Sequence, residues 1–426
     1  MKFLVSPGTL HGDICIPGSK SHTIRGLLIG SLASGTSVLR RPLQSADAES
    51  CIAACRALGA EVEAESDECW QIHGTAGRPD PRTHRVDVGN SGTTFFLSLT
   101  AAALGTEEIE FDGDRQLRRR SAGPLADVLR QMGAEVWSRD GDDCPPISVQ
   151  GPIRGGSVSI ECPTSQYLSS LLIGCPLAPG DTDITVPLLH ESPYVEMTCA
   201  WLRRRSVRFE AKKDFSRVHI PGGQHYTGFE AEIPADFSSA TFFLVAAAVT
   251  SSELFLRGLD MDDTQGDRAV VWMLEEMGCE VETSEEGVRI RGPETLSGGE
   301  FDLNATPDAL PAMAVAGCAA DGETRLVNVP QARDKETDRI SAMARELRKL
   351  GGEVEELEDG LVLRGNRLSG AEVDGRGDHR IAMALAVAGL AAEGRTEVET
   401  AECVSVTFPT FADLMRQVGA DIDTTD

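Results

Sequence analysis

The sequence contains 426 residues, with 40 lysines and arginines against 67 aspartates and glutamates, which gives a net charge of −27. This length corresponds to about two or three domains, and an apolar content of 41% is ordinary for a globular protein. The negative balance disfavours a nucleic-acid binder, which needs a basic surface to displace counterions. It is compatible with a small anionic ligand, because a single site can be locally basic.

The start of the chain and its cysteines indicate a cytoplasmic protein. The opening residues MKFLVSPGTLHGD contain no apolar run long enough for a signal peptide, and no later stretch is long enough to span a membrane. The 11 cysteines are odd in number and scattered, without a Cys-x-x-Cys pair. We therefore expect reduced thiols, with neither a disulfide framework nor a metal site.

The first segment that suggests chemistry is a helix start near residue 20, directly after a strand. Pro17–Arg25 reads PGSKSHTIR. Glycine lets the backbone approach a ligand closely. The helix N-terminus and Lys20 attract an anion, to which Ser21 can donate a hydrogen bond. An ordinary helix cap can look the same, so this segment alone predicts only an anion site.

A short phrase recurs along the chain and divides it into repeats. In each copy a helix is followed by glycine, then by a small, an acidic and a β-branched residue; the glycines are Gly59, Gly133, Gly278, Gly351 and Gly419. Glycine is favoured at the positive φ that ends a helix, so we expect a strand after each one. The copies recur about every 70 residues, except for one interval of about twice that length.

Midway through the long interval we expect a degenerate copy that has lost its glycine. A helical pattern over 195–204 leads there into Arg205–Phe209. This gives six α+β units, in one of which Glu353–Glu358 and Gly360–Arg364 read as a hairpin. Alanine-rich helices such as Ile381–Ala392 are apolar on nearly all sides, so we expect them to be buried among sheets. The repeats predict two lobes of three units.

Several further phrases follow in chain order. They are GNSGTT at Gly89–Thr94, DGDRQLRRR at Asp112–Arg120, TSQY at Thr164–Tyr167, PY at Pro193–Tyr194, DLNATPDA at Asp302–Ala309, KETDR at Lys335–Arg339, DHR at Asp378–Arg380 and TFP at Thr407–Pro409. Together with PGSKSHTIR, they resemble the enolpyruvyl transferases, and within these the 5-enolpyruvylshikimate-3-phosphate synthase family (3-phosphoshikimate 1-carboxyvinyltransferases). The resemblance runs from about Pro7 to about Leu414.

The resemblance implies an α+β fold of two lobes, each built from three βαβαββ units in an inside-out α/β barrel. It places residues 1–18 and 234–426 in lobe 1 and residues 19–233 in lobe 2. The chain is expected to cross between the lobes near Gly18 and near Pro234. The number of units agrees with the count obtained from the repeated phrase.

The resemblance also implies a reaction. The family transfers the carboxyvinyl (enolpyruvyl) group of phosphoenolpyruvate to the 5-hydroxyl of shikimate 3-phosphate and releases phosphate, by addition and elimination. An acid protonates the methylene carbon, and a base takes the hydroxyl proton. No metal or organic cofactor is implied. The expected partners are these two small substrates, without nucleic acid or membrane, and we expect a cytoplasmic monomer of the shikimate pathway that closes its lobes on them.

Individual residues receive roles from the resemblance. Catalysis is implied for Lys20, for Asp308 as the base at the acceptor hydroxyl, and for Glu336 as the acid at the methylene. Phosphoenolpyruvate is expected to bind to Lys20, Gly92, Arg120, Gln166, Arg339 and Arg380. The acceptor is expected to bind to Ser21, Arg25, Thr164, Ser165, Gln166, Tyr194, Asp308, Gln331 and Lys335.

Some of these residues have simpler interpretations. Glu336 and Arg339 stand three apart on an expected helix, where they would form a plain surface ion pair. Asp378–Arg380 would serve as a cap for the following helix, with His379 structural. Runs of arginine are typical of solvated faces, so we give no site role to the arginines at 118, 119 and 203–205.

Three positions depart from the family pattern. Phe96 replaces an arginine, Val406 replaces a lysine that contacts the phosphate of phosphoenolpyruvate, and Glu191 stands where a serine often meets the acceptor's phosphate. A slip of one residue would bring Ser192 there instead. Arg118, Arg119 and Arg376 are the candidates to replace the two lost cations. The alternative hypothesis is a carboxyvinyltransferase with a different cyclic hydroxyl acceptor, phosphorylated or not, or a non-catalytic anion-binding paralogue.

Overall fold

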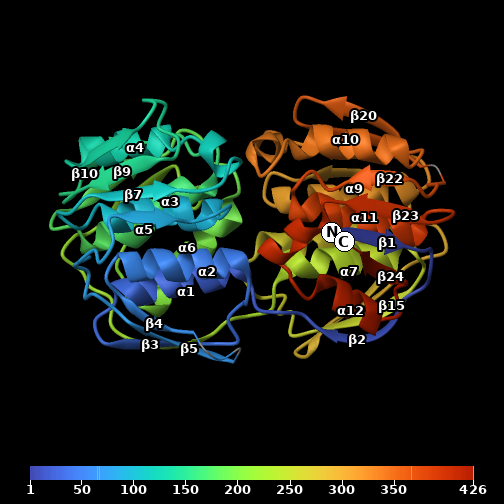
Figure 1. Cartoon of the computed structure of the whole chain (residues 1–426), viewed down its shortest axis with the longest axis horizontal. Helices are drawn as coiled ribbons and strands as arrows, with labels where there is room; N and C mark the ends of the chain where they lie inside the picture. Colours follow the sequence, from blue (N-terminus) through green and yellow to red (C-terminus); the bar gives the residue numbers. More distant parts are fainter. Residues whose placement is uncertain (65, 67, 366, 426) are drawn as a thin grey trace. The chain divides into compact units, whose positions relative to one another are not determined.

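The computed structural model describes residues 1–64, 66, 68–365 and 367–425. The chain forms two compact units (Figure 1): unit 1 consists of Met1–Pro17 with Pro234–Asp426, and unit 2 consists of Gly18–Ile233. The chain passes between the units after Pro17 and again after Ile233. Within the described ranges, no helix is both long enough and apolar enough to cross a membrane.

The described part of the chain contains six sheets of four strands each, and one of them illustrates the common plan. Its elements are β6 (Arg85–Asp87), α3 (Gly92–Ala102), β7 (Ile109–Asp112), α4 (Gly123–Gln131), β8 (Glu135–Ser138) and β9 (Ile147–Gln150). Strand β6 pairs in parallel with β7, and β9 pairs antiparallel with both β7 and β8. The plan is the expected βαβαββ unit, and six sheets confirm the number of repeats.

The other two sheets of unit 2 follow the same plan. One has β10 (Gly156–Ser159), α5 (Ser165–Gly174), β11 (Thr182–Thr185), α6 (Ser192–Arg204), β12 (Glu210–Ala211) and β13 (Arg217–Ile220). The other has α1 (Lys20–Leu32), β3 (Thr36–Arg40), α2 (Ala46–Ala57), β4 (Glu61–Glu63), β5 (Cys69–His73) and β14 (Glu230–Glu232). In the second sheet the strand parallel to β3 is β14. The last strand of unit 2 along the chain therefore completes the sheet of the unit's first repeat.

Unit 1 contains the remaining three sheets. The first has β2 (His11–Cys15), α7 (Phe237–Val249), β15 (Glu253–Arg257), α8 (Ala269–Glu276), β16 (Glu280–Ser284) and β17 (Gly287–Arg291). The second has β18 (Glu300–Asp302), α9 (Leu310–Ala319), β19 (Glu323–Val327), α10 (Arg339–Lys349), β20 (Glu353–Leu357) and β21 (Gly360–Arg364). The third has β22 (Glu372–Asp374), α11 (His379–Ala391), β23 (Thr396–Glu399), α12 (Phe411–Gln417), β24 (Ile422–Thr425) and β1 (Lys2–Val5). Strands β20 and β21 are antiparallel neighbours, which confirms the predicted hairpin.

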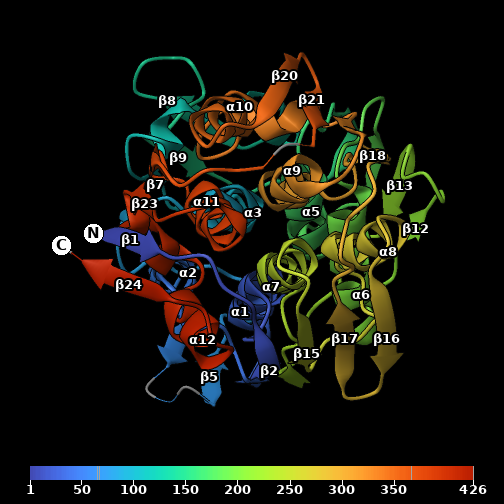
Figure 2. The ribbon, with the colours of Figure 1, turned by 90° about the vertical axis from the view of Figure 1, so that its right-hand side faces the viewer.

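Each unit is built around three helices. In unit 1, α7, α9 and α11 contact one another, and Figure 2 shows them end-on with strands around them. All residues of α11 from His379 to Leu390 are buried, as expected for this alanine-rich segment. In unit 2, α3 contacts both α1 and α5. Because protein surrounds α11 on all sides, its sequence is apolar almost all round.

The repeated phrase ends helices as predicted. The glycines at 59, 133, 278, 351 and 419 all have φ between 86° and 106°. In the degenerate copy Ser206, the second residue after α6, also has a left-handed conformation, with φ of 58°. The structure adds a contact that the sequence analysis missed: in four copies an arginine near the helix end donates to the backbone carbonyl of the following strand, in the pairs Arg56–Val62, Arg130–Val136, Arg348–Val354 and Arg416–Ile422.

Short 3₁₀ helices carry several of the residues discussed below. They are η1 (Leu117–Arg119), η2 (Cys175–Leu177), η3 (Gly266–Arg268), η4 (Pro307–Ala309), η5 (Pro330–Asp334) and η6 (Ala401–Val406).

Candidate active site

The start of α1 holds Lys20 against a neighbouring helix. Lys20 is the first residue of α1, and its Nζ lies 3.1 Å from Oδ2 of Asp47, which projects from α2. A Cβ on Gly18 would collide with the carbonyl oxygen of Arg41, so only glycine lets the chain enter the helix here. The predicted helix start is confirmed. The sequence analysis did not identify Asp47, because its contact with Lys20 arises from the packing of α2 against α1.

Arg25 is a buried cation that joins α1 to α6. Its exposed fraction is 1%. Nε donates to Oγ1 of Thr198 at 2.8 Å, and Nη2 donates to the carbonyl oxygen of Tyr194 at 3.0 Å. Nη1 donates to the carbonyl oxygen of Ser21 at 3.0 Å. Burial lowers the pKa of Arg25 to about 10. The structure therefore brings three of the expected acceptor residues together: Ser21, Arg25 and Tyr194.

Gly92 and Arg120 are in direct contact at the start of α3. A Cβ on Gly92 would collide with Nη1 of Arg120, so glycine is what allows the guanidinium to lie against this helix end. One residue further, Oγ1 of Thr93 accepts a hydrogen bond from Nε2 of Gln166 at 3.1 Å, which links α3 to α5. Gly92, Arg120 and Gln166, which were expected to bind the same anion, are thus gathered at neighbouring helix starts.

The start of α5 carries a buried carboxylate from another element. Oε2 of Glu191 accepts from the Ser165 hydroxyl at 2.9 Å, from the Ser165 backbone N–H at 3.1 Å and from the Thr164 hydroxyl at 3.3 Å. Glu191 is 2% exposed, whereas Ser192 is exposed. The residue that faces Thr164 and Ser165 is therefore Glu191, and the suggested slip to Ser192 is wrong.

Phe96 belongs to the core of unit 2. Its ring lies 4.8 Å from that of Phe95 and 5.3 Å from that of Tyr167, measured between centroids. The Tyr167 hydroxyl donates to the carbonyl oxygen of Ser121 at 2.7 Å. The position where the family carries arginine is thus filled by an aromatic cluster.

Arg339 is the centre of a cluster in unit 1. Its side chain is 1% exposed. Nε donates to Asp378 at 2.8 Å, Nη1 donates to Asp308 at 2.7 Å, and Nη2 pairs with Glu336. Burial alone would lower the pKa of Arg339, but the carboxylates of Asp378, Glu336 and Asp308 outweigh it and raise the pKa above its usual value. One guanidinium therefore fixes three carboxylates, of which Asp308 and Asp378 come from other segments of the chain. We call Arg339, its three carboxylates and Arg380 the unit 1 cluster.

Asp308 lies between two arginines of this cluster. Oδ1 faces Arg339, and Oδ2 lies 3.0 Å from Nη2 of Arg380. Asp378 caps α11 by accepting from the Arg380 backbone N–H at 2.9 Å. The capping interpretation of Asp378–Arg380 is therefore confirmed, and it does not exclude a site role, since Asp378 also binds Arg339. The sequence analysis missed this second contact of Asp378.

Glu336 lies outside the helix on which the sequence analysis placed it. Helix α10 begins at Arg339, and Asp338 caps it by accepting from the Ser341 backbone N–H at 3.0 Å. The pairing of Glu336 with Arg339 exists. Because Arg339 is buried and also holds two other carboxylates, the interpretation as a plain surface ion pair is wrong.

Gln331 and Lys335 lie on the segment that leads to Glu336. Gln331 is in η5, and its Nε2 donates to the carbonyl oxygen of Asn304 at 3.0 Å, close in sequence to Asp308. Lys335 follows η5 directly. The segments 302–309 and 331–336 are therefore tied together within unit 1.

A further buried carboxyl lies near Asp308. Asp267, in η3, is 1% exposed and accepts a hydrogen bond from the Thr306 hydroxyl. Burial raises the pKa of Asp267, and the charge of Asp308 adds to this effect. The sequence analysis did not identify Asp267, because only the tertiary structure brings η3 and η4 together.

Two of the candidate replacement cations are paired with buried carboxylates. Nη2 of Arg376 lies 2.6 Å from Oε1 of the buried Glu346, and Nη2 of Arg118 lies 2.7 Å from Oδ2 of the buried Asp112. Each guanidinium is thus held by a carboxylate of its own unit. Val406 is half-buried at the end of η6.

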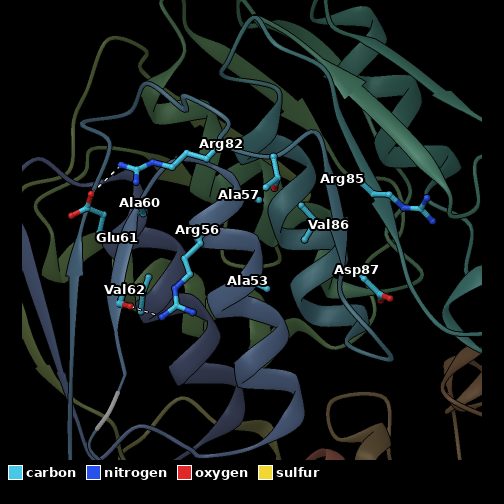
Figure 3. Close-up of a pocket in the computed structure, with 11 residues that line it drawn as sticks. Ala53, Arg56, Ala57, Ala60, Glu61, Val62, Arg82, Arg85, Val86 and Asp87 are labelled. Atoms are coloured by element: carbon cyan, nitrogen blue, oxygen red, sulfur yellow. Dashed lines mark hydrogen bonds and ion pairs between the residues drawn. The ribbon is translucent and has the colours of Figure 1, made fainter.

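The cavity in Figure 3 is not the candidate site. It has a volume of about 580 Å³ and is lined by α2, β4 and residues 82–87 of unit 2, with none of the expected site residues among them. Nη2 of Arg82 lies 3.0 Å from Oε1 of Glu61, and Nη2 of Arg56 donates to the carbonyl oxygen of Val62 at 2.7 Å. These two guanidinium groups are thus already engaged. Elsewhere, no metal-binding group of histidine, cysteine, aspartate and glutamate occurs in the part of the chain that the structure describes, and all 11 cysteines are free thiols.

The chain is similar to known proteins over nearly its whole length. A family model described as EPSP synthase (3-phosphoshikimate 1-carboxyvinyltransferase) matches residues 5–415. The chain is 51% identical over 413 residues to the 3-phosphoshikimate 1-carboxyvinyltransferase of Acetivibrio thermocellus, covering 97% of each protein. It is 47% identical over 419 residues to that of Ruminiclostridium cellulolyticum, covering 98% of this chain and 99% of the relative. A solved structure of EPSP synthase from Acinetobacter baumannii is similar over 100% of both chains, with a TM-score of 0.84 and 28% identity.

Proposed function

Because the chain belongs to the EPSP synthase (3-phosphoshikimate 1-carboxyvinyltransferase) family, we propose that it transfers the carboxyvinyl group of phosphoenolpyruvate to the 5-hydroxyl of shikimate 3-phosphate. The oxygen of that hydroxyl bonds to the central carbon of phosphoenolpyruvate, the methylene gains a proton, and the acceptor hydroxyl loses one. Phosphate then leaves, and loss of a methyl proton restores the vinyl group. The comparisons favour no other acceptor.

The observation that carries the proposal is the unit 1 cluster. The reaction needs an acid and a base held in fixed positions, and Arg339 holds Glu336 and Asp308 on one guanidinium. We assign Asp308 as the base at the acceptor hydroxyl and Glu336 as the acid at the methylene. A non-catalytic anion-binding protein would gain nothing from two carboxylates beside its anion, because they repel it.

The arginines of the same cluster suit the carboxylate of phosphoenolpyruvate. A guanidinium fork matches the two oxygens of a carboxylate, so we assign Arg339 and Arg380 to this group. Gln331 and Lys335, on the adjoining segment, are assigned to the acceptor. In this assignment the substrate carboxylate exchanges for one of the internal carboxylates that the arginines hold without substrate.

The residues of unit 2 are assigned to the phosphate groups and the acceptor ring. We assign Lys20, Gly92, Arg120 and Gln166 to the phosphate of phosphoenolpyruvate, with Lys20 also supporting catalysis. We assign Ser21, Arg25, Thr164, Ser165, Gln166 and Tyr194 to the acceptor. The support is that Arg120 packs on Gly92, and that Arg25 holds the carbonyls of Ser21 and Tyr194. We further propose a cytoplasmic monomer that needs no cofactor.

The test is turnover by the purified chain, measured as phosphate release and as formation of the enolpyruvyl product by mass spectrometry. We expect product with phosphoenolpyruvate and shikimate 3-phosphate. We also expect Asp308→Asn and Glu336→Gln each to reduce kcat by about 10²–10⁴-fold, the range typical of a lost general acid or base. The matched control is Glu300→Gln, which removes an exposed carboxylate from β18 of the same repeat. Absence of product, or full turnover in Asp308→Asn, would contradict the proposal.

A further inference from the structure

A second concave site lies in unit 2, at the C-terminal end of α6. It is a cavity of about 430 Å³, lined by Arg204, Arg205, Ser206, Arg208, Gly223, Gln224, His225, Thr227, Gly228 and Phe229. Three of these residues are arginines and none is an aspartate or glutamate. We call it the arginine pocket.

The arginine pocket stands out against the charge of the whole chain, which is −27. Within the described residues, none of Arg204, Arg205 and Arg208 lies in an ion pair. Their neighbour Arg203 behaves differently, because its guanidinium pairs with Glu196 and packs over the ring of Phe209. The guanidinium groups of the pocket are therefore not directly paired with a carboxylate of the described residues.

Arg205 is held in a fixed position. Its guanidinium carbon lies 3.8 Å from the centroid of the Phe229 ring and 5.4 Å from that of Trp201. Its Nε is buried and has no hydrogen-bond partner in the described structure. Burial lowers the pKa of Arg205 to about 10, and the charge of Arg204 contributes in the same direction. Stacking on two aromatic rings fixes the guanidinium plane in advance of any ligand.

The C-terminus of a helix attracts cations, which is a simpler reason for arginines at this place. That effect accounts for Arg203 and Arg204 in the last turn of α6. It falls off within that turn, so it does not account for Arg208, which lies beyond the helix. The helix C-terminus also does not explain why Nε of Arg205 is buried without a hydrogen-bond partner in the described structure.

We propose that the arginine pocket binds a phosphate group, either as the free ion or as a phosphate monoester. A phosphate dianion offers three oxygens to guanidinium donors, and arginine forks match this geometry. His225 and the polar side chains of Ser206 and Thr227 complete the lining. The site is separate from the proposed acceptor residue on the same helix: Tyr194 lies at the opposite end of α6, whose 13 residues span about 20 Å.

The test measures chemical modification of the pocket arginines themselves, so its outcome does not depend on the proposed function. Phenylglyoxal modifies accessible guanidinium groups, and mass spectrometry reports each modified arginine. We expect millimolar inorganic phosphate to slow the modification of Arg204 and Arg208 several-fold, compared with sodium chloride at the same ionic strength. The internal control is Arg203, one residue away, which should show no protection. Equal rates at Arg204 and Arg208 in phosphate and in chloride would overturn the proposal.

A variant separates this pocket from phosphate bound at the catalytic residues. The triple change Arg204→Gln, Arg205→Met and Arg208→Gln removes the charges but keeps an apolar chain on Phe229. Equilibrium dialysis with labelled phosphate should show one binding site fewer than in the wild type, and turnover without added effector should be unchanged. Arg203→Gln should bind as the wild type does. If the triple variant is folded by circular dichroism and binds as much phosphate as the wild type, the pocket is not a phosphate site.

A third arm distinguishes the two sources of the phosphate group. Phenyl phosphate is a monoester dianion that carries the same phosphate charge with an apolar ring attached. Stronger protection of Arg208 by phenyl phosphate than by inorganic phosphate would assign the pocket to a monoester. Equal or weaker protection would assign it to the free ion.

Discussion

The Ser165 hydroxyl donates to the buried carboxylate of Glu191 at 2.9 Å, at the first residue of α5. The same carboxylate oxygen also accepts from the Ser165 backbone N–H. A helix N-terminus favours an anion because its first N–H groups lack helical partners. The carboxylate of Glu191 therefore occupies the hydrogen-bond donors that we assign to the acceptor.

This contact changes the interpretation of the departure at Glu191. In the sequence analysis, Glu191 was one of the three departures that stood beside the alternative hypothesis of another acceptor. In the structure Glu191 instead sits on the donors of Thr164 and Ser165. It has φ of 59°, a left-handed conformation at the residue that precedes α6. Under the assignment of these donors to the acceptor, we expect a phosphorylated acceptor to displace Glu191, so that Glu191 lowers the affinity for the acceptor rather than excluding it.

Replacement of Glu191 tests this competition. Two anions cannot share the donors of Thr164 and Ser165, so we expect Glu191→Ser to lower KM for shikimate 3-phosphate about tenfold, which corresponds to about 1.4 kcal/mol. KM for phosphoenolpyruvate should stay the same. Steady-state kinetics with each substrate varied in turn provides the measurement. Glu196→Gln, which removes a partly exposed carboxylate from α6, the helix that follows Glu191, is the control. An unchanged or higher KM for the acceptor in Glu191→Ser would show that the carboxylate does not compete.

Replacement of Arg339 by lysine tests the unit 1 cluster. Lysine keeps the charge but has no fork, so it cannot hold Asp378, Asp308 and Glu336 at once. Leaving buried carboxylates uncompensated typically costs about 3–5 kcal/mol, and we expect a loss of this order in the free energy of unfolding in urea, together with loss of turnover. Arg345→Lys, at an exposed position of the same helix, should behave as the wild type. A stable Arg339→Lys variant with normal kcat would refute the central role of the guanidinium.

Substitution of Gly92 tests the contact with Arg120. The new Cβ of Gly92→Ala would collide with Nη1 of Arg120, and the flexible arginine would move away rather than the backbone. We therefore expect KM for phosphoenolpyruvate to rise, with little change in the free energy of unfolding. Gly8→Ala serves as the control, because a Cβ at Gly8 meets no atom within 4 Å. If Gly92→Ala leaves KM for phosphoenolpyruvate unchanged, Arg120 does not bind that substrate from its present position.

The carboxyl of Glu346 is expected to make the free energy of unfolding depend on pH. Burial alone would raise the pKa of its carboxyl, but hydrogen bonds from Lys349 and Arg376 outweigh burial and lower the pKa below its usual value of 4.5. The unfolded chain then binds more protons than the folded one between these two pKa values. The stability that Glu346 contributes is therefore present above pH 4.5 and is lost as the pH falls through the lower, folded value.

The measurement compares urea unfolding of the wild type and of Glu346→Gln at about pH 6 and at about pH 3, below the usual glutamate pKa. We expect the wild type to be the more stable protein at the higher pH and the difference to shrink at the lower one, because only the wild type loses an ionised Glu346. A difference that is independent of pH would mean that the charge of Glu346 contributes nothing.

The sequence by itself determined the repeating architecture of this protein. The end of each repeated helix at Gly59 and its copies depends on the φ angle of a single residue, which is a local property. Ser206 has the same left-handed conformation in the copy that lacks the glycine. Apolar composition on all sides marked α11 as a buried helix for an equally local reason. The phrases around Lys20, Asp308 and Arg339 identified the family because each is a short, continuous run of residues.

Only the tertiary structure decided which charges meet. Arg25 and Thr198 are separated by 173 positions in the sequence, and Arg339 and Asp378 by 39, so no local pattern pairs them. The same holds for Asp47 with Lys20 and for Glu191 with Ser165. The physical reason is that the packing of one helix against another sets the distance between their charged groups, and ion pairs and hydrogen bonds depend on ångström differences in that distance.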